Sequence, residues 1–319
     1  MNRLLRVVLG FIGLGIVIYA GRSLLISREA SELEAPTEPC PLPEPPPDEP
    51  AQIKAVMCGL GDVLIKSSSY KLVRSIGLGD VMWYTSTGGH TTDDLKNMMF
   101  SFIDYMAEVE NKEKRSSSKR TPTIKGHPMS PAMILWKKGK LSSVAMLEIA
   151  LLHVEDMDRN GVFESEVEKR IATNMAKALL DPETQAKSKD EILDSTKIIR
   201  MLASQKDKSG KRKYIFILVS NTETELIPLL TQRFPNIFNI FDDVIMSGDI
   251  GMMKPDEDIY DYILEKYNLK PSECVFLDSA QENIEAAEDI GIHSIKIQKG
   301  CYKQVRTGLA DLGMLPASK

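Results

Sequence analysis

The stretch Ser247-Gly-Asp-Ile-Gly-Met-Met-Lys254-Pro255-Asp256 joins a short apolar run at residues 243–246 to a helical pattern at residues 256–267. Similar β-branched, apolar runs occur elsewhere in the chain, at residues 54–58, 214–219, 274–277 and 293–297. Helical patterns also follow two of these runs, at residues 223–233 and 281–289. Strands that alternate with helices indicate right-handed βαβ units. The sequence therefore predicts an α/β fold with a doubly wound, Rossmann-type parallel sheet.

The residues that follow each expected strand are the candidates for a functional site. Sheets of this kind bind ligands beyond the carboxyl ends of their strands. The positions concerned are residues 59–62, 220–221, 247–254 and 278–279.

A long segment separates the first expected strand from the second. It is mostly helical in pattern, with amphipathic pieces at residues 142–155 and 164–180 and an exposed Lys/Ser-rich loop at residues 111–125. A helical insertion at this point would cover the strand ends as a lid. We therefore expect a core of residues 51–66 and 190–319 and a helical cap of residues 67–189.

The overall composition excludes several classes of protein. The chain has 319 residues, with 40 Lys and Arg against 45 Asp and Glu, for a net charge of −5. These near-average values exclude wholesale disorder and a multi-span membrane protein, and no basic excess suggests nucleic acid as a partner. The four cysteines lack C-x-x-C spacing, which excludes a disulfide scaffold and disfavours a zinc site built on them.

The N-terminus has a different character from the rest. Arg3 and Arg6 precede an apolar run at residues 7–20, which would rise about 21 Å as a helix against a hydrocarbon core of roughly 30 Å. Flanking leucines lengthen the stretch, so residues 1–27 are interpreted as a single-pass N-terminal membrane anchor. A cleaved signal peptide, which would lead to export, remains the alternative. Residues 28–50 alternate proline with acidic side chains, as in a stiff spacer.

The order of motifs resembles that of the haloacid dehalogenase superfamily, in its branch of capped small-molecule phosphatases and dehalogenases. The resemblance rests on the opening stretch and on Val275-Phe-Leu-Asp278 with Asn283-Ile-Glu-Ala-Ala287. Asp181-Pro182-Glu183 and Leu218-Val-Ser220-Asn221 also fit. The resemblance implies an aspartate nucleophile after the first strand and a second acid two residues later. It also implies Mg²⁺ held by the nucleophile and by an acid after the fourth strand, a hydroxyl that binds phosphoryl oxygens, and a charge-stabilising lysine.

The chain departs from this pattern where the chemistry is centred. Gly59 stands at the position of the nucleophile and Gly61 at that of the second acid. Ser279 follows Asp278 where the family usually has a magnesium-binding aspartate, so Mg²⁺ is expected for the family but doubtful here, with Asp278 a weak candidate ligand. Ser220, Asn221 and Lys254 remain as candidates for phosphate binding, or as inherited strand-end hydrogen bonding in which Lys254 pairs with Asp278.

Three other features are candidates for activity or metal binding. Asp62 could replace the nucleophile only from a shifted position, because a strand alternates its faces. Cys58 should point into the core. Asp156-Met-Asp158-Arg-Asn160-Gly161 opens like an EF-hand calcium loop, but Val167 stands where a bidentate Glu is needed, which favours a capped acidic turn.

Three functions are compatible with these residues. The leading hypothesis is a membrane-tethered pseudoenzyme that binds a small phosphorylated ligand or a protein partner. The second is an active hydrolase of small phosphate esters that uses an atypical acid. The third is a purely structural interaction module.

Overall fold

The computed structural model describes residues 52–86, 89–111, 120–298 and 302–316. The proposed anchor and spacer, residues 1–50, lie outside this part, so those interpretations stay predictions. Among the described residues, no helix combines the length and apolar character needed to cross a membrane.

The core is built on a parallel sheet of five strands in the order β7-β6-β1-β8-β9. Ala55 of β1 lies opposite Ile215 of β6 and Cys274 of β8. The strands are β1 (Ala55–Cys58), β6 (Ile215–Ser220), β7 (Asp243–Met246), β8 (Cys274–Asp278) and β9 (His293–Lys296). The predicted α/β class and parallel sheet are confirmed, and each strand agrees with its expected run to within a residue.

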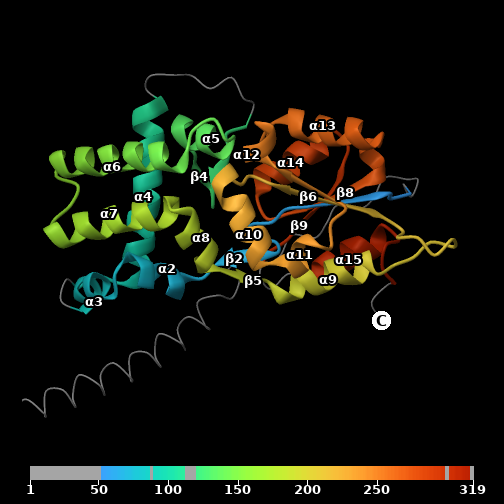
Figure 1. Cartoon of the computed structure of the whole chain (residues 1–319), viewed down its shortest axis with the longest axis horizontal. Helices are drawn as coiled ribbons and strands as arrows, with labels where there is room; N and C mark the ends of the chain where they lie inside the picture. Colours follow the sequence, from blue (N-terminus) through green and yellow to red (C-terminus); the bar gives the residue numbers. More distant parts are fainter. Residues whose placement is uncertain (1–51, 87–88, 112–119, 299–301, 317–319) are drawn as a thin grey trace, which may run out of the picture. The chain divides into compact units, whose positions relative to one another are not determined.

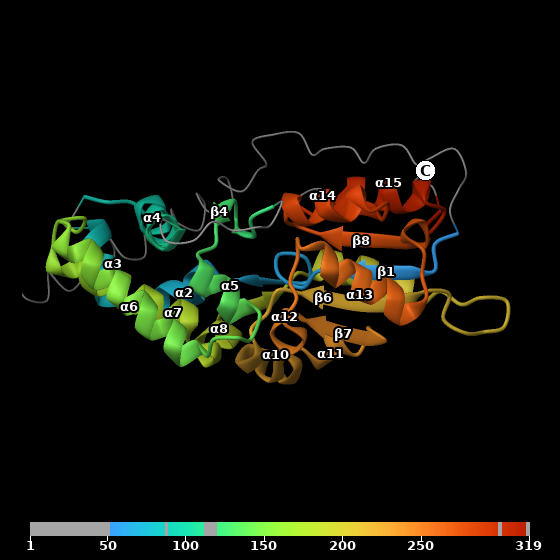
Figure 2. The ribbon, with the colours of Figure 1, turned by 90° about the horizontal axis from the view of Figure 1, so that it is seen from above.

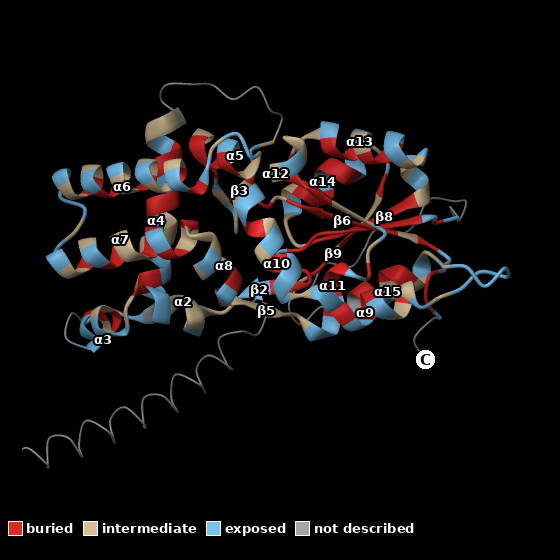
Figure 3. Ribbon diagram, in the orientation of Figure 1, coloured by how far each residue is buried: buried red, intermediate tan, exposed pale blue. Residues whose placement is uncertain are grey.

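Helices cover both faces of the sheet (Figure 1). They are α9 (Leu193–Ala203), α10 (Ile227–Arg233), α11 (Pro235–Phe238), α12 (Ser247–Ile250), α13 (Glu257–Tyr267), α14 (Gln281–Asp289) and α15 (Tyr302–Asp311), with 3₁₀ turns η1 (Thr224–Leu226) and η2 (Pro271–Glu273). Because strand side chains alternate, Val56 packs towards α9 and α15, whereas Met57 packs towards α13 and α14. The strands are buried on both faces (Figure 3), which explains their unbroken apolar runs.

The inserted segment forms a helical cap joined to the core by two short strands. The strands β2 (Ile65–Ser67) and β5 (Lys189–Glu191) pair antiparallel as a stem. The cap helices are α2 (Ser69–Ile76), α3 (Leu78–Ser86), α4 (Thr92–Asn111), α5 (Pro131–Lys137), α6 (Ser143–Arg159), α7 (Glu166–Leu180) and α8 (Pro182–Ser188). A small hairpin, β3 (Thr123–Ile124) and β4 (His127–Pro128), follows α4.

The cap contacts the core beside the carboxyl ends of the strands. In Figure 2 the arrowheads of β7 and β8 point to the side on which α5 and α12 lie. Met253, from the loop after α12, is fully buried in the cap's apolar cluster with Trp136 and Met146. The loop that carries Lys254 is therefore packed against the cap as well as the core.

Candidate functional site

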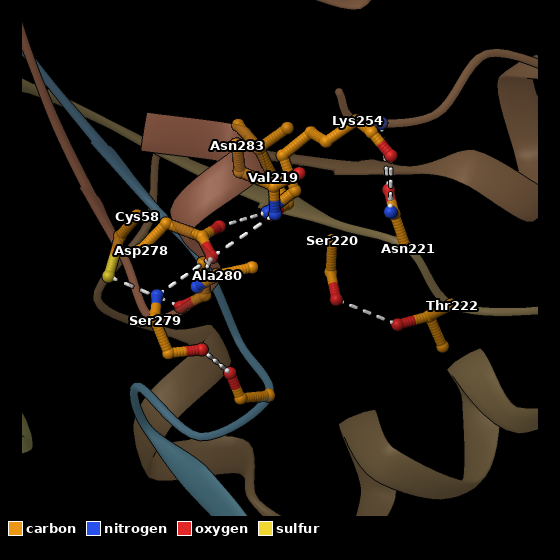
Figure 4. Close-up of polar contacts among 12 residues, drawn as sticks. Cys58, Val219, Ser220, Asn221, Thr222, Lys254, Asp278, Ser279, Ala280 and Asn283 are labelled. Atoms are coloured by element: carbon orange, nitrogen blue, oxygen red, sulfur yellow. Dashed lines mark hydrogen bonds and ion pairs between the residues drawn. The ribbon is translucent and has the colours of Figure 1, made fainter. Parts of the chain in front are cut away.

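The strand ends bring together the predicted site residues Gly59, Ser220, Lys254 and Asp278. Gly59 extends β1 by one hydrogen bond, from its N–H to the carbonyl of Leu277, at 2.8 Å. Asp278 ends the adjacent β8, and Ser220 ends β6 on the other side of β1. Lys254 enters from the loop between α12 and α13 (Figure 4).

The space above Gly59 is filled by a carboxylate. A Cβ atom placed on Gly59 would lie 2.7 Å from Oδ2 of Asp278 and 3.2 Å from the side chain of Val63. Cβ atoms essentially never lie within 3.0 Å of such an atom, so a side chain at position 59 would force Asp278 or the backbone of Gly59 to move. Around Gly61, by contrast, a Cβ atom would meet no atom within 4 Å. The two glycines at the positions where the resemblance implies acids therefore differ: a side chain at Gly59 would collide with Asp278, whereas one at Gly61 would meet open space.

Asp278 and Lys254 form a buried ion pair. Their Oδ2 and Nζ atoms lie 2.5 Å apart, and each residue is only 3% exposed. Lys254 also donates to the carbonyl of Val219 at 2.8 Å. Two charges removed from water are tolerated when they neutralise each other and are hydrogen-bonded. The positive charge that the resemblance assigns to phosphoryl binding is thus balanced inside the protein.

The other oxygen of Asp278 is equally well satisfied. Its Oδ1 accepts the backbone N–H groups of Ser279 and Ala280, at 2.8 and 3.0 Å, and the side-chain amide of Asn283, at 3.2 Å. These three donors hold the carboxylate in one orientation. The Asp278 carboxylate therefore acts as the fixed centre of the strand ends.

The remaining predicted phosphate-binding residues also have partners inside the protein. Ser220 shares a 2.8 Å hydrogen bond with the hydroxyl of Thr222. Asn221 donates to the carbonyl of Lys254 at 2.7 Å and accepts its N–H at 2.9 Å. This reciprocal pair fixes the backbone of Lys254, which is a structural role for Asn221.

Ser279 and Asp62 lie at the exposed side of the site. The Ser279 hydroxyl donates to the carbonyl of Gly61 at 3.2 Å and so joins the loops after β8 and β1. Asp62 has a left-handed backbone with φ of 55°, and its half-exposed carboxylate lies 3.9 Å from the ammonium of Lys125. Asp62 thus faces a cap residue at the surface.

Cys58 lies on the α9 face of β1, opposite to the face that carries Met57. It is fully buried in the apolar cluster on the α9 side, and its thiol donates to the carbonyl of Gly59 at 3.3 Å. Burial, and then the nearby carboxylate of Asp278, raise the pKa of this thiol far above its ordinary value. A reactive cysteine needs the reverse, a stabilised thiolate in reach of solvent.

The donors present do not form the set that Mg²⁺ prefers. This ion takes carboxylate and carbonyl oxygens in octahedral geometry, and the resemblance places two of its ligands at Gly59 and Ser279. Asp278, which precedes Ser279, has both oxygens committed to protein donors. In the part of the chain that the structure describes, positions 59 and 279 therefore supply no carboxylate, and that of Asp278 is already engaged.

Cap residues that the sequence did not indicate contact the core near the ends of β6 and β7. The fully buried carboxylate of Glu223, which follows β6, accepts hydrogen bonds from Lys137 of α5 and, at 2.7 Å, from Gln185 of α8. Ser247 donates to the carbonyl of Lys137 at 2.6 Å. Gly139 has φ of 67°, and a Cβ atom there would lie 2.1 Å from the backbone oxygen of Gly248. No local sequence pattern marks these contacts, because each joins residues far apart in the chain.

The EF-hand-like stretch does not form a calcium loop. Asp156 and Asp158 belong to the last turn of α6, where Asp156 bonds the hydroxyl of Tyr105 and Asp158 bonds Lys169 at 2.7 Å. Oxygens on a continuous helix cannot converge as the ligands of an open loop do. The acidic turn that the sequence favoured is the better description.

Comparison with known proteins establishes the family. The model of haloacid dehalogenase-like hydrolases matches residues 105–291, more than half of the 319 residues, so the chain belongs to this family. The matched range begins after Gly59, so it does not include the first strand.

Shorter matches connect the chain to curated proteins. It is 31% identical over 91 residues to bifunctional epoxide hydrolase 2 of Rattus norvegicus, covering 28% of this chain and 16% of that protein. It is 36% identical over 70 residues to glyceraldehyde 3-phosphate phosphatase of Methanocaldococcus jannaschii, covering 22% and 31%. The chain thus spans less than a third of the length of either relative.

Solved structures are also similar. A HAD family enzyme of Bacteroides thetaiotaomicron gives a TM-score of 0.47 at 16% identity, covering 78% of this chain and 95% of that one. The L-2-haloacid dehalogenase of Xanthobacter autotrophicus gives a TM-score of 0.43 at 15% identity, covering 83% and 85%.

Proposed function

We propose that this protein is a catalytically inactive member of the haloacid dehalogenase family that acts by binding. The observation that carries the proposal is the position of the Asp278 carboxylate, 2.7 Å from where the first side-chain atom of a nucleophile at position 59 would lie. A glycine cannot attack phosphorus, and loss of an essential nucleophile lowers turnover by roughly 10⁴ to 10⁶.

The internal bonding favours a protein partner over a phosphate ester as the bound molecule. Lys254 is paired with Asp278, Ser220 with Thr222, and Asn221 with the backbone of Lys254. A phosphate would have to replace these bonds, at the cost of separating a buried ion pair. The cap and the exposed loops remain available to a partner.

We also propose that residues 1–27 tether the domain to a membrane, with residues 28–50 as the spacer. The support is the basic-flanked apolar run and the proline-rich segment after it. Alkaline carbonate extraction tests this: the full chain should stay with the membrane pellet. A variant without residues 1–27 should appear in the supernatant, and a full chain found there would contradict the tether.

An activity assay tests the inactive state. Purified full chain is incubated with p-nitrophenyl phosphate and Mg²⁺, and we expect release of phosphate at the rate of a blank without protein. Turnover that disappears in Asp62→Ala would overturn the proposal and establish the alternative, an active hydrolase with an atypical acid. Asp104→Ala, which removes an equally exposed carboxylate that lies in the cap, is the matched control.

A binding assay separates a small phosphorylated ligand from a protein partner. We expect inorganic phosphate to leave the melting temperature of the full chain unchanged, because Lys254, the cation predicted to bind it, is already paired with Asp278. Phosphate-dependent stabilisation that is lost in Lys254→Ala would instead show a working anion site.

A further inference from the structure

A cluster of metal-ligating side chains lies in the cap, away from the strand ends. It consists of His90, from the connection between α3 and α4, and of Glu164 and Glu168, around the start of α7. One ligand atom from each residue lies within 4.8 Å of the other two. The three residues come from parts of the chain more than seventy positions apart, so the fold brings them together.

The buried member of the cluster has an oxygen without a hydrogen bond. Glu168 is 7% exposed, and its Oε2 accepts the backbone N–H of Glu164 at 2.7 Å. Its Oε1 accepts no hydrogen bond from the residues that the structure describes and faces Nε2 of His90 at 3.6 Å, beyond hydrogen-bond length. Buried carboxylates are normally paired or bound to a metal.

Neighbouring cations are already engaged elsewhere. Lys169 bonds Glu155 and Asp158, and Arg170 bonds Asp80. Within the described parts of the chain, neither Glu164 nor Glu168 forms an ion pair with a lysine or an arginine.

The ligands are also held in position. The His90 ring stacks on Tyr84, with centroids 4.2 Å apart and planes 8° from parallel. The bond from Glu164 N–H fixes the Glu168 carboxylate, as outer contacts orient the ligands of metal sites. Glu164 is exposed, so its side chain can rotate to bring its carboxylate within bonding distance of an ion held by His90 and Glu168.

We propose that His90, Glu164 and Glu168 bind a divalent transition-metal ion, for which Zn²⁺ is the best match. One imidazole and two carboxylates with water in the fourth position suit tetrahedral zinc, whose bonds to N and O are about 2.0–2.2 Å. Two ligands at such distances lie about 3.3 Å apart, close to the 3.6 Å between Glu168 and His90. A bound ion would tie the start of α4 to the start of α7.

Zinc binding by the full chain tests the proposal. Chelator-stripped protein is titrated with Zn²⁺ in competition with a chromogenic chelator, and its melting temperature is measured with and without the ion. We expect one equivalent to bind and to raise the melting temperature. His90→Gln and Glu164→Gln should each weaken this binding at least tenfold. Glu166→Gln, which makes the same charge change in the same exposed turn, should leave it unchanged.

Other outcomes would contradict the proposed zinc site. These are absence of zinc binding, or one equivalent whose affinity is unchanged in both His90→Gln and Glu164→Gln. Calcium binding that is lost in Asp158→Asn but kept in His90→Gln would assign the metal to the acidic turn instead. Glu164 is exposed, so its variant should fold even if His90→Gln does not.

Discussion

At the scale of single residues, the decisive feature is the difference between Gly59 and Gly61. The resemblance places the family nucleophile at Gly59 and a second acid at Gly61. The structure separates them, because Asp278 fills the space over Gly59 and leaves Gly61 open. The motif alignment located these positions, but it could not show where the carboxylate of Asp278 lies. That depends on Lys254, on two backbone N–H groups of the loop after Asp278, and on the amide of Asn283 in α14.

The first prediction compares alanine at these two positions. Gly59→Ala should lower the free energy of unfolding by about 1–3 kcal/mol, because the new methyl group would overpack against Asp278 and Val63. Gly61→Ala, in open space, should change it by less than about 0.5 kcal/mol. Urea unfolding of both variants measures the difference. Equal effects would mean that the space over Gly59 is not sealed.

The second prediction restores the two family acids together. In the double variant G59D/S279D, carboxylates would gather beside Asp278 with one lysine to balance them, so the metal-free protein should be less stable than the parent. Mg²⁺ should then raise its melting temperature, whereas the parent should not respond.

The single variant S279D is the control for the double variant. It adds one acid without opening the space over Gly59, so its response to Mg²⁺ should be the smaller of the two. An equal response would show that position 59 takes no part in holding the ion.

At the scale of elements, the sequence predicted the sheet well and the stem poorly. The five core strands have long apolar runs because both of their faces are buried. The stem strands β2 and β5 have three residues each and pair Ile65 with Glu191. Such short strands carry no periodicity and are held by long-range pairing, so no local pattern indicates them. The expected amphipathic helix at 142–155 continues to Arg159 as α6, which takes up the first acids of the EF-hand-like motif.

The third prediction concerns the contact between β7 and α13. Burial opposes ionisation of Asp243, but hydrogen bonds from Lys266 and Tyr267 of α13, at 2.6 and 2.7 Å, lower its pKa below the ordinary value. A carboxyl group with a lower pKa in the folded state stabilises the protein above its unfolded pKa of about 3.9 and loses this effect as the pH falls.

Asp243→Asn is the variant that measures this effect. It should lower the free energy of unfolding by about 1.5–3 kcal/mol at pH 7, the range for hydrogen bonds to charged groups. The difference from the parent should shrink as the pH falls from 5 towards 3. A difference independent of pH would show that the charge of Asp243 contributes nothing.

At the scale of the whole described domain, the cap and core share buried groups. Met253 of the core lies in the cap's apolar cluster, and Gly139 of the cap meets the backbone of Gly248. The fully buried carboxylate of Glu223, in the core, accepts hydrogen bonds from two cap residues, Lys137 and Gln185. A lid that admits and releases substrate must separate from its core. These contacts resist separation, which agrees with a protein that binds a partner on its surface rather than turning over substrate beneath its cap.

The last prediction tests this coupling through Glu223. Glu223→Ala leaves the ammonium of Lys137 and the amide of Gln185 without their acceptor in a nearly buried site, which should cost about 3 kcal/mol of stability. It should also make the stem at residues 65–67 and 189–191 a site of limited proteolysis, because the cap would then separate from the core. The parent should unfold in one calorimetric transition and resist cleavage there.

Glu183→Ala is the control, because it removes an exposed ion pair with Lys187 on α8. It should change stability by less than about 1 kcal/mol. If the stem is cleaved equally in the parent and in Glu223→Ala, the cap is not held by this carboxylate and moves freely.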